Sequence, residues 1–169
     1  MLTNKIDITY VLALTMPSKD TIHDRVKQAI INDGWQITND PYVISYGERF
    51  LFIDLGARDS INLEDTERQL IGLQQDNVKI AIEIKTFRNP SPIVDLEQAI
   101  GQYTLYKILL SKVDPHRIIY LAITEQTYNE IFNEPLGGLV IEELPLNLII
   151  IDVFQLKVKQ WIPKRPIEK

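Results

Sequence analysis

The sequence predicts a mixed α/β domain in which helices flank a mixed central sheet. Three observations support this class: an amphipathic helix opens the main region, several short apolar strands follow it, and a long second helix separates these strands from further ones. The resulting order is αβββαβ, followed by a C-terminal αββ unit. Because helices both precede and follow the central strands, packing them on the faces of one sheet is the natural architecture.

The first element is a helix expected over residues 18–33. Apolar residues recur there at helical spacing, Ser18 can cap the start, and Gly34 ends the helix. Three extended segments follow, which we expect at 35–38, 43–46 and 50–55. Alternation in the third segment puts Asp54 on the same face as Phe50 and Phe52.

The second half of the domain begins after a polar segment, 58–78, that contains a weakly helical stretch at 63–73. A strong apolar strand is expected at 78–87, and prolines at 90 and 92 then break the chain. The remaining elements are expected to be a helix at 93–112, a strand at 117–124, a short helix at 125–133, and strands at 148–154 and 157–162.

Length and composition indicate one globular domain. The 169 residues include 45% apolar and 24% charged residues, which is ordinary for a folded protein with its own core. We expect the domain to span residues 16–162, with an N-terminal extension at 1–15 and a loosely held C-terminal tail at 163–169.

The composition also excludes some chemistry and some locations. The chain has no cysteine and two histidines, so disulfides and cysteine-based zinc sites are excluded and a cytoplasmic setting is expected. No apolar run approaches the ~20 residues of a membrane helix, and no secretory signal is evident. The net charge of −5 disfavours strong unaided binding to nucleic acid and favours dependence on a partner.

The strand around residue 83 carries the most informative pattern. Alternation sends Ile80, Ile82 and Ile84 to one face, and Glu83 and Lys85 to the other. Burying a charge without compensation is costly, so both need a partner, a metal or a solvent-filled cleft. An ordinary ion pair on a solvated face is the alternative, and it would be favoured for an isolated Glu-x-Lys.

Asp54 offers the matching carboxylate, because it ends a strand expected to lie beside the Glu83 strand. Two carboxylates on neighbouring strands can bind Mg²⁺, with the carbonyl of Ile84 and waters completing an oxygen shell. Such a metal activates water and neutralises charge at a phosphate. Lys85 would orient the attacking water or stabilise developing negative charge. We therefore predict a catalytic centre of Asp54, Glu83 and Lys85, with Asp54 and Glu83 as metal ligands.

Two helices supply further candidates. On the helix at 93–112, Gln102 lies at the border of the apolar face, one turn before Tyr106, where the pair can contact a phosphate or support the carboxylates. Packing at the helix edge is the alternative. On the first helix, Lys19, Asp20 and His23 are candidates for the rim of the site, and a histidine satisfied at the core boundary is the alternative for His23.

Several short blocks, taken in order, resemble the XisH family. They are Met16-Pro17-Ser18-Lys19-Asp20, His23, Asp33-Gly34-Trp35, Thr38-Asn39-Asp40-Pro41, Ile53-Asp54-Leu55-Gly56-Ala57, Ile80-Ala81-Ile82-Glu83-Ile84-Lys85, Gly101-Gln102-Tyr103 and Val158-Lys159-Gln160-Trp161-Ile162. These cyanobacterial proteins are described as controlling factors for excision of the fdxN DNA element during heterocyst development. The chain departs from the family in residues 1–15 and in a longer segment between Ala57 and Lys79.

The resemblance implies a restriction-endonuclease-like core of the PD-(D/E)xK class, whose motif Asp54, Glu83 and Lys85 match. Gln102 and Tyr106 resemble the Gln-x-x-x-Tyr element of RecB-like nucleases. The resemblance also implies DNA as a partner, together with a small companion protein of the XisI type.

Three functions remain open at this point. The chain is expected to be a Mg²⁺-dependent DNA endonuclease that acts with a partner in DNA rearrangement. The alternatives are a non-catalytic excision control factor that binds protein or DNA through the same fold, and a structural domain with carboxylates in surface pairs. Whether the chain forms a homo-oligomer is also open.

Overall fold

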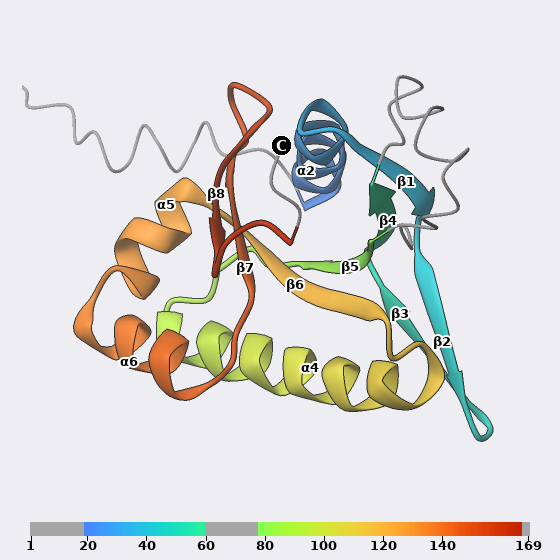
Figure 1. Ribbon diagram of the computed structural model, residues 1–169. Helices are drawn as coiled ribbons and strands as arrows, with labels where there is room; N and C mark the ends of the chain where they lie inside the picture. Colours follow the sequence, from blue (N-terminus) through green and yellow to red (C-terminus); the bar gives the residue numbers. More distant parts are fainter. Residues whose placement is uncertain (1–18, 60–77, 167–169) are drawn as a thin grey trace, which may run out of the picture.

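A six-stranded mixed sheet separates two layers of helices (Figure 1). The computed structural model describes residues 19–59 and 78–166, apart from the side chains of Lys19 and Asp20. The strand order is β1-β4-β5-β6-β7-β8, in which β5, β6 and β7 are parallel and the other neighbours are antiparallel. The strands are β1 (Trp35–Asn39), β4 (Leu55–Asp59), β5 (Lys79–Ile84), β6 (Arg117–Thr124), β7 (Leu148–Asp152) and β8 (Lys157–Ile162). The predicted mixed sheet flanked by helices is confirmed.

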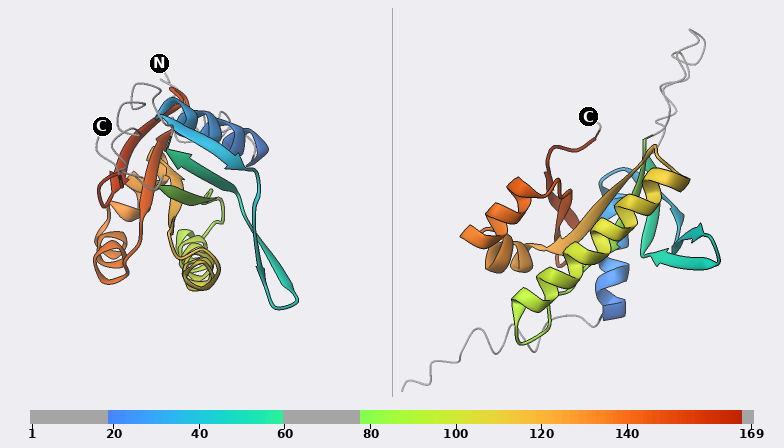
Figure 2. Two further views of the ribbon diagram at one scale, coloured as in Figure 1. Left: turned by 45° about the vertical axis from the view of Figure 1, so that its right-hand side comes forward. Right: turned by 90° about the horizontal axis from the view of Figure 1, so that it is seen from below.

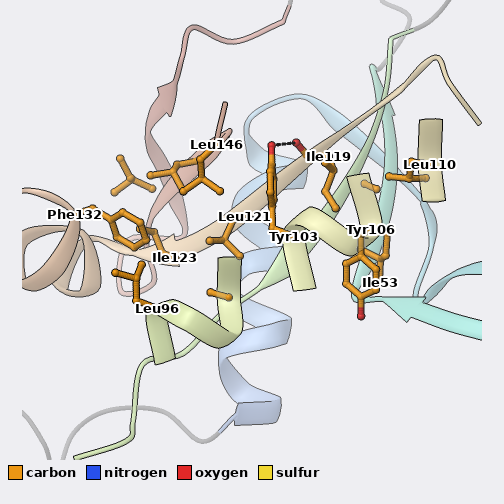
Figure 3. Packing of buried hydrophobic residues seen from close by; sticks show 14 of the residues in the cluster. Ile53, Leu96, Tyr103, Tyr106, Leu110, Ile119, Leu121, Ile123, Phe132 and Leu146 are labelled. Atoms are coloured by element: carbon orange, nitrogen blue, oxygen red, sulfur yellow. Dashed lines mark hydrogen bonds between the residues drawn. The ribbon is translucent and has the colours of Figure 1, made fainter. Parts of the chain in front are cut away.

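One helix covers each face of the sheet. Helix α2 (Lys19–Asn32) packs Ile22, Val26 and Ile30 against the face that carries Ile80 and Ile82. Helix α4 (Pro92–Val113) covers the opposite face, which includes Leu121 and Ile123 (Figure 3). The buried positions of α4 include the apolar stripe predicted for this helix, namely Leu96, Ala99, Tyr103, Tyr106 and Leu110, with Ile100 half-buried. Burial of each large apolar side chain stabilises the fold by about 1.5–3 kcal/mol.

The hairpin of β2 (Tyr42–Tyr46) and β3 (Arg49–Ile53) projects from the body of the molecule (Figure 2). Its inner face packs on α4 through the buried residues Ile44 and Ile53. The strands expected at 35–38 and 43–46 are confirmed, and the second of them, β2, pairs with β3.

The segment predicted as one strand over 50–55 is two strands, because the chain bends at Asp54. Alternation over a single strand at 50–55 would put Ile53 and Leu55 on one face, and this expectation is wrong. The bend moves Ile53 into the core beneath α4 and Leu55 into the core beneath α2. Strand β4 continues to Asp59, and β5 ends at Ile84 rather than at Phe87. The weakly helical stretch expected at 63–73 lies outside the described residues.

The C-terminal part contains a helix that the sequence did not predict. The expected short helix at 125–133 is formed by α5 (Glu125–Thr127) and the π-helical turn η2 (Tyr128–Phe132), and α6 (Pro135–Glu143) then follows. Two adjacent glycines lower the helix propensity of α6 and conceal it from pattern analysis. Pro135 occupies its first turn, where a missing N–H costs nothing.

The C-terminal tail contacts the body of the domain through Arg165. Arg165 donates from Nη2 to the carbonyl of Asp33 at 2.8 Å, and its guanidinium lies 5.3 Å from the ring centre of Trp35. These contacts connect the segment up to residue 166 to the body of the domain, while 167–169 lie outside the described residues. Within the described ranges, no helix combines the length and hydropathy needed to cross a membrane.

The close packing of α6 predicts that Gly137→Ala destabilises the fold by about 1–3 kcal/mol or more. A Cβ at this position would lie 2.1 Å from the carbonyl oxygen of Ile131 and 2.4 Å from the Cα of Phe132. Gly138→Ala is the matched control, since a Cβ there meets nothing within 4 Å and alanine should stabilise the helix by about 0.5–1 kcal/mol. Urea unfolding of both variants measures the difference, and equal stabilities would contradict this packing.

Candidate active site

Asp54 and Glu83 are brought together by the register of β4 and β5. Leu55 pairs with Ile82 in this antiparallel ladder, so continuing the register by one residue puts Asp54 opposite Glu83. The bend at Asp54 turns its carboxylate toward β5, where Oδ2 accepts a hydrogen bond from the amide of Ile84 at 2.7 Å. The expectation that the Asp54 and Glu83 strands lie side by side is confirmed.

Glu83 is a buried carboxylate near the carboxyl end of β5, with 4% of its surface exposed. Its Oε1 pairs with Nζ of Lys85 at 2.9 Å, and no described residue hydrogen-bonds to its buried Oε2. Burial raises the pKa of Glu83 and the nearby charge of Asp54 raises it further, while Lys85 only partly opposes them. The alternative of an ion pair on a solvated face is therefore wrong, because this carboxylate is buried and incompletely compensated.

The carboxylate pair fits a magnesium ion. Mg²⁺ is commonly held by one or two protein carboxylates, with waters and substrate phosphates as the other ligands. Glu83 Oε2 is a buried acceptor without a hydrogen bond, which is the kind of atom that a cation would satisfy. In the part of the chain that the structure describes, no group of three or more histidine, aspartate or glutamate side chains could hold a metal. The two carboxylates that could contribute to a cation site here are those of Asp54 and Glu83.

Tyr106 and Gln102 join the site through the strand that carries Asp54. The Tyr106 hydroxyl donates to the carbonyl of Phe52 at 3.1 Å and accepts from Nε2 of Gln102 at 3.4 Å. Phe52 precedes Asp54 by two residues, so this chain of hydrogen bonds anchors the end of β3. Burial raises the pKa of Tyr106, and the charge of Glu83 raises it further, which places the phenol within the field of the carboxylates.

His23 belongs to a different cluster. Its Nε2 lies 2.8 Å from Oδ1 of Asp40, and Lys27 donates to Oδ2 of the same carboxylate at 2.7 Å. Burial alone would raise the pKa of Asp40, but Lys27 and His23 outweigh it and hold this pKa below its usual 3.8. These contacts tie His23 to the β1–β2 junction and favour the interpretation as a satisfied boundary histidine. The side chains of Lys19 and Asp20 lie outside the described part of the structure.

One buried carboxylate near the site was missed from the sequence. Asp95, in the first turn of α4, accepts hydrogen bonds from the backbone and side chain of Asn89. It thereby fixes the loop that connects Lys85 to α4. An acidic residue just after Ser91-Pro92 is a known signal for a helix start, and it could have identified this anchor.

Comparisons with known proteins converge on one family. Residues 16–159 match the family model described as XisH protein. A crystal structure of an fdxN element excision controlling factor protein from Anabaena variabilis is similar at 34% identity and a TM-score of 0.70, covering 85% of this chain and 99% of that one. A crystal structure of an XisH family protein from Nostoc punctiforme is also similar, at 34% identity and a TM-score of 0.69. The match covers 84% of this chain and 98% of that one. No curated protein matches the chain.

The raised pKa of Glu83 predicts that the wild-type protein loses stability as the pH rises from about 4.5, the ordinary value for this group. In this window the unfolded chain releases the proton while the folded chain keeps it, so the free energy of unfolding falls with increasing pH. Glu83→Gln removes that contribution, and urea unfolding in metal-free buffer between pH 4.5 and 7 measures the difference from wild type. Glu97→Gln, an exposed change on α4, is the control, and superimposable profiles of wild type and Glu83→Gln would contradict the shift.

Tyr106→Phe should lower the free energy of unfolding by about 0.5–1.5 kcal/mol, because the carbonyl of Phe52 loses its donor. Amide hydrogen exchange should also speed up in β3 and at Ile84, since the strand that presents Asp54 is less firmly held. Tyr103→Phe is the matched control, because its hydroxyl contacts Asn147 and Pro145 rather than β3. Faster exchange in β3 in both variants would contradict a specific role of the Tyr106 hydroxyl and would indicate that the whole domain is destabilised.

Proposed function

The chain belongs to the XisH family, and on that premise we propose that it is a Mg²⁺-dependent DNA endonuclease that acts with a partner protein in programmed DNA element excision. The observation that carries the proposal is the buried, incompletely compensated carboxylate of Glu83 beside Asp54 and Lys85. The proposal includes a restriction-endonuclease-like core of the PD-(D/E)xK type, whose motif these three residues match.

The residues have distinct roles in this proposal. Asp54 and Glu83 would hold the metal, which supplies charge neutralisation at the scissile phosphate and activation of water. Lys85, which pairs with Glu83 in this structure, would be released from that carboxylate if Glu83 held a cation, and its ammonium could then orient the attacking water or stabilise the negative charge that develops on the phosphate. Gln102, half-buried at the end of the Tyr106 hydrogen-bond chain, would contact a neighbouring phosphate.

Dependence on a partner follows from charge. Affinity for DNA comes largely from neutralising phosphates, and a chain with a net charge of −5 brings little of that attraction. A companion protein, for which the XisI type is our candidate, would supply the missing positive surface and bring the DNA to the carboxylates.

A second candidate function is a non-catalytic control factor that uses the same fold to bind DNA or protein. The direct ion pair between Lys85 and Glu83 favours it, because lysine already supplies one positive charge to the carboxylate. The relative from Anabaena variabilis is an fdxN element excision controlling factor, which is the role that this candidate would share.

The endonuclease proposal predicts Mg²⁺-dependent nicking of supercoiled DNA by the purified chain together with its companion. Glu83→Gln should slow nicking by at least about 100-fold, because it removes a metal-binding charge from the centre of the site. Mg²⁺ should also raise the melting temperature of the wild-type protein but leave Glu83→Gln unchanged, since a ligand that binds only the folded state stabilises it.

Glu97→Gln is again the control, because it removes one exposed carboxylate from α4. It should preserve both the nicking and the stabilisation by Mg²⁺. Stabilisation by Mg²⁺ without nicking on any substrate would favour the control factor. If Mg²⁺ neither stabilises the protein nor supports nicking, the proposed metal site is rejected.

A further inference from the structure

A pocket of about 360 Å³ lies at the carboxyl ends of the parallel strands β6 and β7. Its apolar part comes from Ile151 on β7, from Val153 just after the strand, and from the exposed ring of Phe154. Crevices at the carboxyl ends of parallel strands are the usual ligand sites of such sheets. None of its lining residues belongs to the Asp54–Glu83 site. The two sites are close along the sheet, because the amide of Lys85 donates a hydrogen bond to the carbonyl of Ala122 on β6, two residues before Thr124.

Three carboxylates surround this apolar floor. Glu125 and Glu130 come from α5 and η2, and Asp152 ends β7, whereas the described residues that line the pocket include no lysine or arginine. Oδ1 of Asp152 accepts hydrogen bonds from the backbone amides of Phe154 and Gln155, so this carboxylate is held in place at the rim of the pocket. An apolar cavity with an acidic rim complements a ligand that has an aliphatic stem and a positive head.

One lysine beside the pocket is held only by a weak ion pair. Lys159 on β8 reaches Glu125 at 3.5 Å, and both side chains are more than two-fifths exposed. Exposed pairs of this kind contribute about 0–1 kcal/mol, so an incoming cation can displace Lys159 from Glu125. Arg25 of α2 also approaches, but it donates to the backbone carbonyl of Val153 rather than to a carboxylate. Lys157, the cross-strand neighbour of Asp152, is exposed.

Charge decides between the classes of occupant. Nucleic acid is disfavoured, because three carboxylates repel phosphates. A second copy of this chain is disfavoured as well, since its net charge is −5. We infer that this pocket docks a basic peptide segment of a partner protein, in which an arginine or lysine beside an aliphatic residue enters the space between Phe154 and the carboxylates of Glu125, Glu130 and Asp152.

The test uses ¹⁵N-labelled full-length protein without metal or DNA, so its outcome is independent of the proposed nuclease activity. The probe is the peptide acetyl-Leu-Arg-amide, and the matched control probe carries citrulline, which is close in shape to arginine but uncharged. The arginine peptide should shift the amide resonances of residues 124–130 and 151–154 at millimolar concentration, and the citrulline peptide should not.

Two variants should move the affinity in opposite directions. Glu130→Gln should weaken binding of the arginine peptide about two- to fivefold, and Lys159→Gln should strengthen it by a similar factor, because a competing cation is removed. Glu48→Gln, on the distant tip of the β2–β3 hairpin, removes the same charge outside the pocket and should leave the affinity unchanged (Figure 1). Equal responses to both peptides, equal effects of Glu130→Gln and Glu48→Gln, or no shifts at these residues would overturn the inference.

Discussion

The hydrogen bond from the amide of Ile84 to the carboxylate of Asp54 is the contact on which the rest of the site depends. It joins the bend between β3 and β4 to the end of β5, and it does so beside the buried Glu83. The same bend sends Ile53 to the core beneath α4 and Leu55 to the core beneath α2. One polar contact thus links both layers of the molecule to a pair of carboxylates whose mutual repulsion opposes their approach.

The surrounding structure offsets this repulsion by rigid support. Tyr106 holds β3 through the carbonyl of Phe52, and Asp95 holds the loop after Lys85 through Asn89. Both supports come from α4, which also covers the sheet with its apolar face. The helix therefore contributes to stability and to the geometry of the site at once. Residual strain from a buried carboxylate is typical of sites in which a cation supplies the missing compensation.

Sequence patterns predicted the parts of this arrangement that depend on local periodicity. Alternation in β5 placed Glu83 on the α4 face, and the helical stripe on α4 placed Tyr106 toward it. The bend at Asp54 was not predictable, because it arises from a hydrogen bond to a residue 30 positions away. The same limit explains the missed α6, where Gly137 is required by contact with Ile131 and Phe132 rather than by helix propensity. For His23, the helical pattern suggested a place at the rim of the site, but its side chain pairs with Asp40 at the β1–β2 junction instead.

The acidic character of the chain connects its two candidate sites. A site that handles phosphates needs positive charge around it, and this chain concentrates carboxylates both at Asp54 and Glu83 and around the β6–β7 pocket. Both sites lie at the carboxyl ends of adjacent parallel strands, since the end of β5 is bonded to β6 near Thr124. A basic segment held in the pocket would therefore bring positive charge to the edge of the sheet where the metal would bind. If the proposed function holds, the partner would do more than recruit DNA, because its charge would also change the electrostatic potential at Asp54 and Glu83.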